Sequence, residues 1–307
     1  YQIPNTKYQI PNNKRMILLD GKKTSNDIKD EIAKAVTKLK LEGKKTPHLA
    51  AILVGSDGAS MTYVNAKVKA CHRVGFNSTL IDLPQATTEQ TLLETIDKLN
   101  NDNDIDGFIV QLPLPKQIDE QNVLMAVNPD KDVDGFHPIN VGKMTLDLPS
   151  FLPATPYGIM ELLERYEVET SGKNVVVIGR SHIVGRPMSI LMSQKRRAGN
   201  ATVTVAHSHT KNLSEVTKNA DIIVAALGIP EFLTGDMVKE GVVIIDVGIT
   251  RVEDASKPRG YRLAGDVHFE SVSKKASFIT PVPGGVGPMT IAMLLKNTLL
   301  ACERNFK

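Results

Sequence analysis

The sequence is poor in cysteine and aromatic residues and contains no tryptophan. Two cysteines among 307 residues, with no CxxC pair, exclude a disulfide framework and a cysteine-rich zinc site. They favour a reducing, cytoplasmic compartment. Aromatic residues make up 5% of the chain, which argues against base-stacking modules, so we expect no nucleic-acid partner. No apolar run reaches the roughly 18 residues that span a bilayer, so we expect no membrane-spanning segment.

A surplus of positive charge is also missing from most of the chain. The first fifteen residues hold three of the 37 basic residues and no acidic one, so the remainder balances the 34 acidic residues. A protein that grips phosphate backbones would carry a basic surplus there. The segment 1–15 repeats the pentapeptide Tyr-Gln-Ile-Pro-Asn and lacks the apolar core of a signal peptide. We predict that it is an extension outside the fold.

Short apolar runs alternate with amphipathic stretches, and this order predicts parallel sheets covered by helices, in two α/β domains. The expected strands are 49–54, 76–83, 105–111, 174–178, 201–206, 222–226 and 242–247. The expected helices are 61–74, 89–99, 157–166, 184–192 and 289–301. A loop-rich stretch at 128–156 indicates the boundary. We therefore predict one domain at 16–155, closed by the C-terminal helix within 289–307, and a second, Rossmann-like domain at 156–288.

A glycine turn between an expected strand and helix predicts a dinucleotide site. Gly179 ends the strand where a side chain would block a phosphate, and Gly185 lies where helix and strand pack closely. The pattern is Gly-x-Ser-x-x-x-Gly rather than GxGxxG, so it gains its meaning from the strand before it and the helix after it. A purely structural turn is the alternative.

The residues after the next expected strand indicate which dinucleotide binds. Enzymes that prefer NAD usually place a carboxylate there, but this sequence has His-Ser-His-Thr-Lys at 207–211. Arg180, in the glycine turn, can reach the same corner. We predict NADP as the cofactor. The alternative is that Arg180 and Lys211 are solvated surface cations.

Three further patterns contain candidate catalytic or binding residues. Tyr63 and Lys67 lie four apart on one helical face, and Gln111 follows a buried strand at the edge where parallel sheets place ligands. Asp134 lies in the acidic turn 130–135, which lacks the glutamate that a calcium loop needs at position twelve. The plainer interpretations are a packed tyrosine with a solvated lysine, a loop-capping amide, and Asx-type capping of the turn.

A proline- and glycine-rich segment at 281–288 predicts a fixed, tight loop that approaches a ligand or the neighbouring domain closely. Several other chemistries lack their motif. The sequence has no HExxH, GxSxG or GxxxxGK[ST], which disfavours metalloproteases, α/β-hydrolases and P-loop NTPases. The Tyr-x-x-x-Lys pair precedes the glycine turn, the reverse of the order in short-chain dehydrogenases. No metal site is expected.

Taken together, six segments resemble the bifunctional methylenetetrahydrofolate dehydrogenase/methenyltetrahydrofolate cyclohydrolase family. They occur in order and cover nearly all of the chain after residue 15. The segments are Tyr-Val-Asn-Ala-Lys at 63–67, Val-Gln-Leu-Pro-Leu-Pro at 110–115, Asp-Lys-Asp-Val-Asp-Gly at 130–135, Pro-Ala-Thr-Pro at 153–156, Val-Ile-Gly-Arg-Ser at 177–181 with Val-Gly at 184–185, and the stretch from Thr280 to Thr290.

The resemblance implies a role for each matched residue. Lys67 would be the catalytic lysine, held by Gln111, with Tyr63 beside the pterin and Asp134 on the donor edge of its ring. Further folate contacts would come from the loop residues Pro283, Gly284 and Gly285. The implied cofactor residues are Gly179, Arg180, Ser181, Gly185, Ser208 and Ile249.

The resemblance also implies the architecture and the chemistry. Two α/β domains would flank a cleft, the final helix would return to the first domain, and the protein would be a homodimer. The enzyme would oxidise methylenetetrahydrofolate with NADP and hydrolyse the methenyl product to formyltetrahydrofolate. Two alternatives stay open: a shikimate-type NADP dehydrogenase with the same architecture, and a non-catalytic folate- or nucleotide-binding protein. An NAD-using member of the same family is a third.

Overall fold

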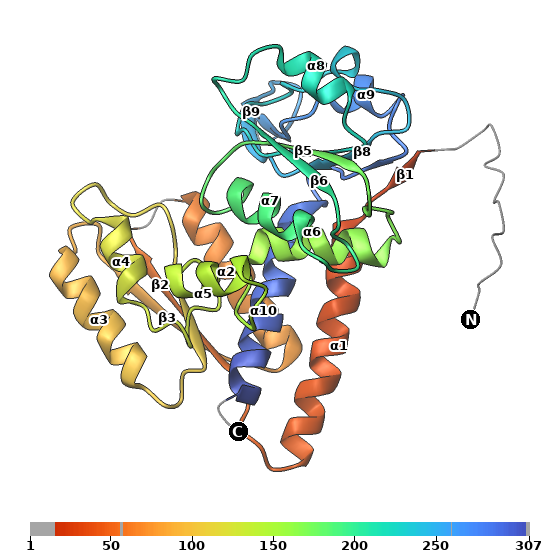
Figure 1. Cartoon of the computed structure of the whole chain (residues 1–307). Helices are drawn as coiled ribbons and strands as arrows, with labels where there is room; N and C mark the ends of the chain where they lie inside the picture. The colour runs from red at the N-terminus through yellow and green to blue at the C-terminus, as the bar shows by residue number, and fades with distance from the viewer. Residues whose placement is uncertain (1–15, 56–57, 259, 305–307) are drawn as a thin grey trace, which may run out of the picture.

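The computed structural model describes residues 16–55, 58–258 and 260–304, and the predicted extension at 1–15 lies outside these described residues. Two lobes are joined by long helices (Figure 1). None of the helices in the described parts combines the length and the apolar character needed to cross a membrane.

The first lobe is built on a parallel three-stranded sheet with the strand order β3-β2-β4. Its strands are β2 (His48–Val54), β3 (Asn77–Leu83) and β4 (Gly107–Val110). Its helices are α2 (Gly58–Val74), α3 (Glu89–Asn101), α4 (Glu120–Ala126) and α5 (Pro138–Thr145). All seven residues of β2 are buried, as expected for the central strand of a sheet covered on both faces.

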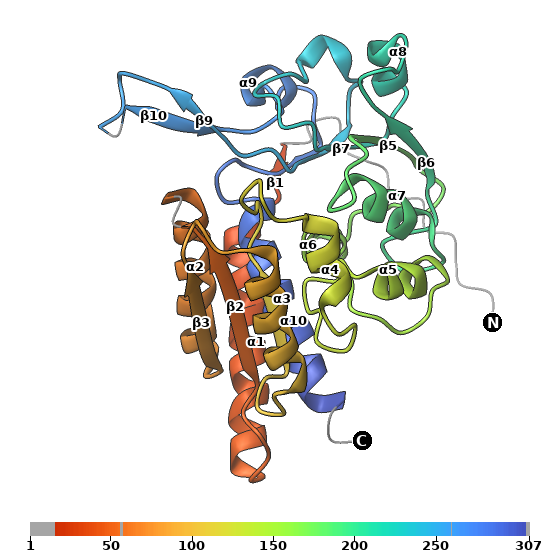
Figure 2. The same cartoon turned by 90° about the vertical axis from the view of Figure 1, so that its left-hand side faces the viewer.

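The second lobe is built on a parallel six-stranded sheet with the order β1-β11-β8-β7-β5-β6. Its strands are β1 (Ile17–Leu18), β5 (Asn174–Ile178), β6 (Thr202–Ala206), β7 (Ile222–Ala225), β8 (Val243–Asp246) and β11 (Phe278–Ile279). Short helices α7 (Gly185–Ser193), α8 (Leu213–Lys218) and α9 (Phe269–Val272) accompany it, with a 3-10 turn at Gly235–Met237. A hairpin of β9 (Thr250–Glu253) and β10 (Tyr261–Ala264) projects from this lobe (Figure 2).

Alternate residues of β2 belong to different cores. Leu49, Ala51 and Leu53 join the core that runs through both lobes, whereas the intervening residues pack against α3 and α4. The shared core also takes in α1 (Gly21–Leu41), α6 (Ala154–Arg165) and α10 (Val286–Arg304). Because α10 packs against both α6 and α1, these three helices connect the lobes.

The predicted strands and helices are present, with ends that differ by a few residues. The stretch 128–156, expected to be loop, also holds α5, because Pro138 occupies a first-turn position and the His137 ring accepts a hydrogen bond from the backbone N–H of Ile139. The sequence patterns gave no expectation for α1 or for the hairpin. Strand β1, within the predicted first domain 16–155, lies in the sheet of the second lobe, paired with β11.

Candidate active site

Each sheet has a switch point where successive connections leave in opposite directions, and ligands bind at such points beyond the carboxyl ends of the strands. In the first lobe it lies between β2 and β4, and in the second between β5 and β7. Gln111 directly follows β4, and Gly179 directly follows β5. Gln111 and Gly179 therefore lie at the edges of the two sheets where ligands are expected.

Lys67 and Gln111, 44 residues apart in the chain, meet at the first of these edges. The Lys67 ammonium donates a hydrogen bond to Gln111 Oε1 at 3.0 Å. The amide in turn donates from Nε2 to the carbonyl of Leu112 at 2.7 Å, and its backbone N–H continues the sheet by donating to Ile52. The Gln111 oxygen thus faces the amine, while its Nε2 and its backbone N–H are engaged elsewhere.

Burial disfavours the charged forms of both Lys67 and Asp134 in this corner. Burial lowers the pKa of Lys67, and the charge of Asp134 opposes that shift. Burial likewise raises the pKa of Asp134, and Lys67 opposes it. Tyr63 lies one helical turn before Lys67 on α2 and is 44% exposed, so its ring is available to a ligand. Lys67, Gln111 and Asp134 therefore lie together, with Tyr63 one turn away on the helix that carries Lys67.

Asp132 builds the turn that carries Asp134. Its buried carboxylate accepts hydrogen bonds from the backbone N–H groups of Gly135, Phe136 and His137 and from the Asn140 side chain. The predicted Asx-type capping of this acidic turn is therefore present, at Asp132. Burial raises the pKa of Asp132 to about 6. The motif Asp-Lys-Asp-Val-Asp-Gly contained the signal, but it did not distinguish the capping carboxylate from Asp134.

The proline- and glycine-rich loop lies against the start of α1. Gly284 has a φ of +109°, a conformation that favours glycine, and its carbonyl accepts a hydrogen bond from Lys22 at 2.8 Å. A Cβ on Gly21 would lie 1.8 Å from the Gly285 carbonyl oxygen, so the two backbones touch. The close approach predicted for this loop is thus made to α1. The structure leaves the folate contacts of Pro283, Gly284 and Gly285 as a prediction.

The glycine turn of the second lobe fits a phosphate-bearing cofactor. Gly179 has a φ of +125°, and a Cβ there would lie 2.2 Å from the Ala226 carbonyl oxygen. A Cβ on Gly185 would collide with the Gly179 carbonyl, so both positions require glycine. Ser181 accepts hydrogen bonds from Val184 and Gly185 at the start of α7. The turn therefore presents backbone at the N-terminus of α7, where a phosphate is favoured.

The remaining predicted cofactor residues follow other strands of the same sheet. Ser208 comes two residues after β6 and Ile249 three residues after β8, and both are exposed. Because these strands are parallel to β5, they end at the edge that carries Gly179. Arg180 is also exposed. Arg180, Ser208 and Ile249 are thus exposed and follow the strands of this edge, and their cofactor contacts stay predictions.

Two buried carboxylates at this edge were not anticipated from the sequence. Asp246 accepts hydrogen bonds from Gly248, Asp266 and Val267, and Asp266 accepts from Leu227 and Gly228. They thereby connect the loops after β7 and β8. Burial raises the pKa of Asp246 to about 7. Two aspartates beside glycines were the sequence signal, but their pairing depends on the fold.

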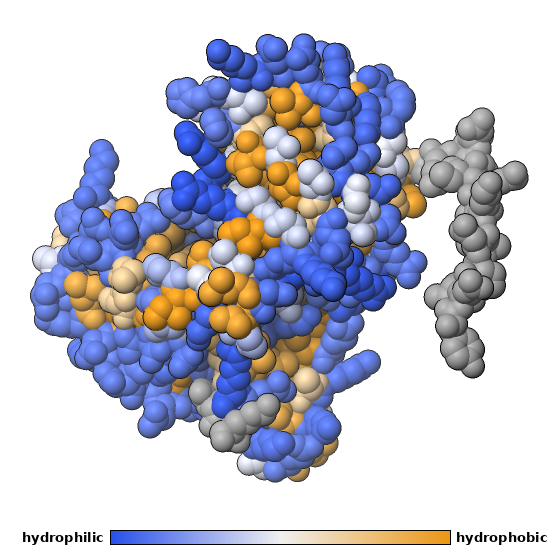
Figure 3. Space-filling model, in the orientation of Figure 1, coloured by the Kyte–Doolittle hydropathy of each residue, from blue (hydrophilic) through white to orange (hydrophobic). Residues whose placement is uncertain are grey.

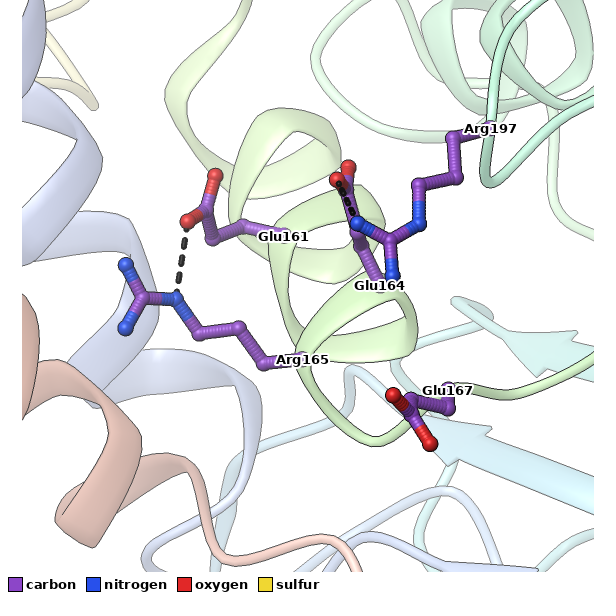
Figure 4. A pocket seen from close by; sticks show the side chains of 5 residues that line it. All are labelled: Glu161, Glu164, Arg165, Glu167 and Arg197. Carbon is purple, nitrogen blue, oxygen red and sulfur yellow. Dashed lines mark hydrogen bonds and ion pairs between the residues drawn. The ribbon is translucent and has the colours of Figure 1, made fainter.

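A charged pocket lies elsewhere, at the end of α6 (Figure 4). Arg165 pairs there with Glu161, and Arg197 pairs with Glu164. Arg165 also reaches Glu31 on α1, and Lys296 on α10 pairs with Glu161. These ion pairs join α1, α6 and α10. The pocket contains no predicted site residue, so we interpret it as structural.

Comparison with known proteins covers both lobes. The model of the tetrahydrofolate dehydrogenase/cyclohydrolase catalytic domain matches residues 19–134, and the model of the NAD(P)-binding domain of the same family matches residues 153–306. The bifunctional protein FolD of Flavobacterium johnsoniae is 71% identical over 286 residues, which cover 93% of this chain and 97% of the relative.

Solved structures agree with this match. The bifunctional FolD dehydrogenase/cyclohydrolase of Campylobacter jejuni has 49% identity and a TM-score of 0.89, over 94% of this chain and 99% of that one. The Trypanosoma brucei enzyme, solved in complex with NADP and an inhibitor, has 39% identity and a TM-score of 0.90, over 95% and 99% of the two chains. The similarity spans both lobes, and the ranges matched by the two family models include the glycine turn and the Lys67–Gln111 pair.

Proposed function

Because this chain belongs to the tetrahydrofolate dehydrogenase/cyclohydrolase family, we propose that it catalyses two consecutive steps on a one-carbon folate. The first oxidises 5,10-methylenetetrahydrofolate to the methenyl form with NADP, and the second hydrolyses that product to 10-formyltetrahydrofolate. The matches to the family models and to solved structures confirm four predictions: the family, the two-domain α/β fold class, the enzyme class and the cofactor. The observation that carries the proposal is the Lys67–Gln111 hydrogen bond at the edge of the first sheet.

The cofactor side fits NADP. Gly179, Gly185 and Ser181 would hold the phosphates, Arg180 and Ser208 the 2′-phosphate, and Ile249 would contact the nicotinamide end. Positive φ at Gly179 and the capped start of α7 support the first assignment, and the absence of a carboxylate from 207–211 supports the second. When bound, NADP accepts the hydrogen and electrons that leave the methylene carbon.

Lys67 is proposed to handle the proton in the hydrolysis. Water bonds to the cationic methenyl carbon and loses one proton. A C–N bond then breaks and the released nitrogen takes a proton up, while the hydroxyl becomes the formyl C=O and releases its proton to solvent, so that one proton is lost overall. A neutral Lys67 amine can accept the first proton and return it to the nitrogen. Its burial and the substrate's positive charge both disfavour the ammonium form. Gln111 keeps the amine in place throughout.

The folate itself is proposed to lie between Tyr63 and Asp134. The exposed Tyr63 ring offers an apolar face to the pterin, and the Asp134 carboxyl offers an acceptor to its donor edge. Pro283, Gly284 and Gly285 would border the substrate from the loop before α10. The Coulombic coupling of Lys67 and Asp134 supports a single site for binding and chemistry.

Lys67→Met tests the mechanism. It removes the amine but keeps the length of the side chain. We expect the cyclohydrolase rate to fall by about a hundredfold or more, as for loss of a general base, while part of the dehydrogenase activity remains. Both are followed spectrophotometrically. Lys69→Met, at an exposed position on the same helix, is the matched control. Wild-type rates for both reactions in Lys67→Met would show that Lys67 is not catalytic.

The same assays separate the alternatives. A shikimate-type dehydrogenase would oxidise a hydroxy acid but no folate, and the 71% identity to a FolD protein over nearly the whole chain disfavours it. A non-catalytic binding protein would gain thermal stability from NADP without turnover. The Lys67–Gln111 pair disfavours this second alternative, because it fixes a partly buried amine at the proposed substrate site, as proton transfer requires.

A homodimer is proposed on the basis of the second lobe. Strand β6 forms an edge of the six-stranded sheet, and its Val205 side chain is 37% exposed. Figure 3 shows apolar surface on the face of this lobe. The projecting β9–β10 hairpin offers a second contact with another copy. Sedimentation equilibrium measures the mass directly.

We also propose a cytoplasmic location and the domain division 16–155 with 289–307, and 156–288, in which β1 of the first domain completes the sheet of the second. Contacts of α10 with β2, β4 and α2 support the return of the last helix to the first domain. The free, buried thiols of Cys71 and Cys302 support a reducing compartment.

A further inference from the structure

Asn297 is a buried polar residue that the proposed chemistry does not use. It lies on α10 and is 2% exposed, and apart from its neighbour Thr298 the buried positions of this helix are apolar or hold cysteine. A buried amide is costly unless its hydrogen bonds are made. Its partners therefore indicate why an amide is present in the core.

The Asn297 amide bonds to the segment that carries Asp134 and to the segment before α6. Nδ2 donates to the Val133 carbonyl at 2.8 Å and to the Leu152 carbonyl at 3.0 Å. Val133 immediately precedes Asp134. Leu152 lies in the segment before α6, and its backbone lies against Gly135. One side chain from α10 thus joins the two stretches that flank Asp134, 164 residues away in sequence.

Three other contacts leave the Asp134 backbone little freedom. Its carbonyl accepts a hydrogen bond from Ala154 at 3.3 Å. The next residue, Gly135, has a φ of +76°, and a Cβ there would lie 2.5 Å from the Leu152 carbonyl carbon. The Asp132 carboxylate fixes the turn that follows. From α10, the Thr290 hydroxyl bonds to Thr155, next to Ala154, whereas the Asn297 amide bonds to Val133 and Leu152. Among the bonds of the described residues, Asn297 is thus the side chain of α10 that bonds directly to the residue before Asp134.

Helix α10 also begins at the glycine loop proposed to border the folate. Val286, its first residue, follows Gly285, and Asn297 lies eleven residues later, about 16 Å along the axis. The helix runs from the junction of the two lobes along α1 (Figure 1). It therefore links two parts of the proposed folate site through rigid backbone.

We propose that Asn297 is a positioning residue for folate binding, which holds the Asp134 segment at the distance from α10 that the site requires. The inference rests on the proposed function of Asp134 as a folate ligand. Asn297 itself touches neither the substrate nor the cofactor. Its loss leaves two buried carbonyls without their donor, so the segment shifts toward an arrangement that satisfies them.

The test compares folate and NADP binding in Asn297→Leu, which keeps the volume of the side chain but removes both donors. We expect the KM for methylenetetrahydrofolate to rise about tenfold or more, with the Kd for NADP, measured by titration calorimetry, within about twofold of wild type. Thr298→Val is the matched control. Thr298 is equally buried on α10, but its hydroxyl bonds only within the helix, to Leu294.

The measurements distinguish a failure of the Asn297 proposal from a failure of the proposed role of Asp134. An unchanged folate KM in Asn297→Leu overturns the proposal, as does an equal rise in Thr298→Val or a parallel loss of NADP binding. If Asn297→Leu does not fold, Asn297→Gln, which keeps the amide one methylene further out, is judged by the same criteria. Asp134→Ala is measured alongside. If Asp134→Ala leaves the folate KM unchanged, the proposed role of Asp134 is wrong. If the folate KM rises in Asp134→Ala but not in Asn297→Leu, only the proposed role of Asn297 is wrong.

Discussion

At the scale of single residues, the site depends on how one amine is held and charged. Lys67 donates to Gln111, and burial of the pair lowers the pKa of the amine. An amide is suited to this position because it accepts a hydrogen bond without adding charge. A carboxylate would make the same contact and stabilise the ammonium form. The identity of residue 111 therefore sets the pH range in which Lys67 is neutral.

Gln111→Glu tests this argument. The added negative charge should raise the pKa of Lys67, so the cyclohydrolase pH–rate profile should move to higher pH and the rate at neutral pH should fall about tenfold or more. The pH dependence of the single-turnover rate measures the shift. Gln111→Leu removes the contact without adding charge, so its profile should not move upward. An unshifted profile in Gln111→Glu contradicts a proton-accepting Lys67.

The cofactor preference is also a single-residue question. Arg180 follows the glycine turn, and no carboxylate follows β6 to repel a 2′-phosphate. Arg180→Ala should raise the KM for NADP by about tenfold or more and change that for NAD much less, because only NADP carries the phosphate. Steady-state kinetics with both cofactors measure this. Equal changes would mean that Arg180 does not contact the 2′-phosphate.

At the scale of helices, the lobes are joined where α6 and α10 approach closely. Gly158 of α6 makes this possible, since a Cβ there would lie 2.8 Å from Met289 Cβ and 3.1 Å from the Met289 carbonyl carbon. The contact is between two backbones rather than between flexible side chains. A larger residue would have to push the helices apart, and with them the lobes that carry the folate and cofactor residues.

Gly158→Ala should therefore destabilise the protein by about 1–3 kcal/mol, because crowding exceeds the gain of about 1 kcal/mol in helix propensity. Urea denaturation measures the change. Gly142→Ala, at an exposed position of α5 with nothing within 4 Å of the added methyl group, isolates the propensity gain and should be neutral or stabilising. Equal stabilisation of both variants would show that α6 and α10 can separate freely.

At the scale of the whole molecule, two buried carboxyl groups influence how stability depends on pH. Burial raises the pKa of Asp132 to about 6 and that of Asp246 to about 7. In the unfolded chain such groups titrate near 4. Between these values the folded protein binds protons that the unfolded chain has released. Their contribution to stability is therefore present at low pH and is lost as the pH rises toward 7.

Asp246→Asn should remove part of this slope. Relative to the variant, the wild type should lose roughly 1–4 kcal/mol of unfolding free energy between pH 4 and 8. Denaturation midpoints across this range, at fixed protein concentration, measure the difference. Asp221→Asn should have the opposite effect: relative to this variant, the wild type should gain unfolding free energy as the pH rises, because the ion pair with Lys239 lowers the pKa of Asp221. Parallel wild-type and Asp246→Asn curves would mean that the pKa of Asp246 is the same in the folded and unfolded states.

Local patterns predicted most of the fold. Alternating apolar runs located the strands and helices of both sheets, and the glycine turn at 179–185 was placed between β5 and α7. Elements that depend on partners were harder. Helix α1 carries many charged residues and is ordered by packing on α10, and β1 is two residues long and exists through its pairing with β11. Neither has a strong signal of its own.

The sequence by itself determined the family, the order of elements and the residue types available for chemistry. Periodicity, turns and motifs each depend on residues that are close together in the chain, so they can be recognised without the fold. Only the tertiary structure decided which of those residues meet. It brought Lys67 to Gln111 over 44 residues and Asn297 to the Asp134 segment over 164. Such contacts follow from how whole sheets and helices pack, since burial and charge at a site are sums over segments distant in the chain.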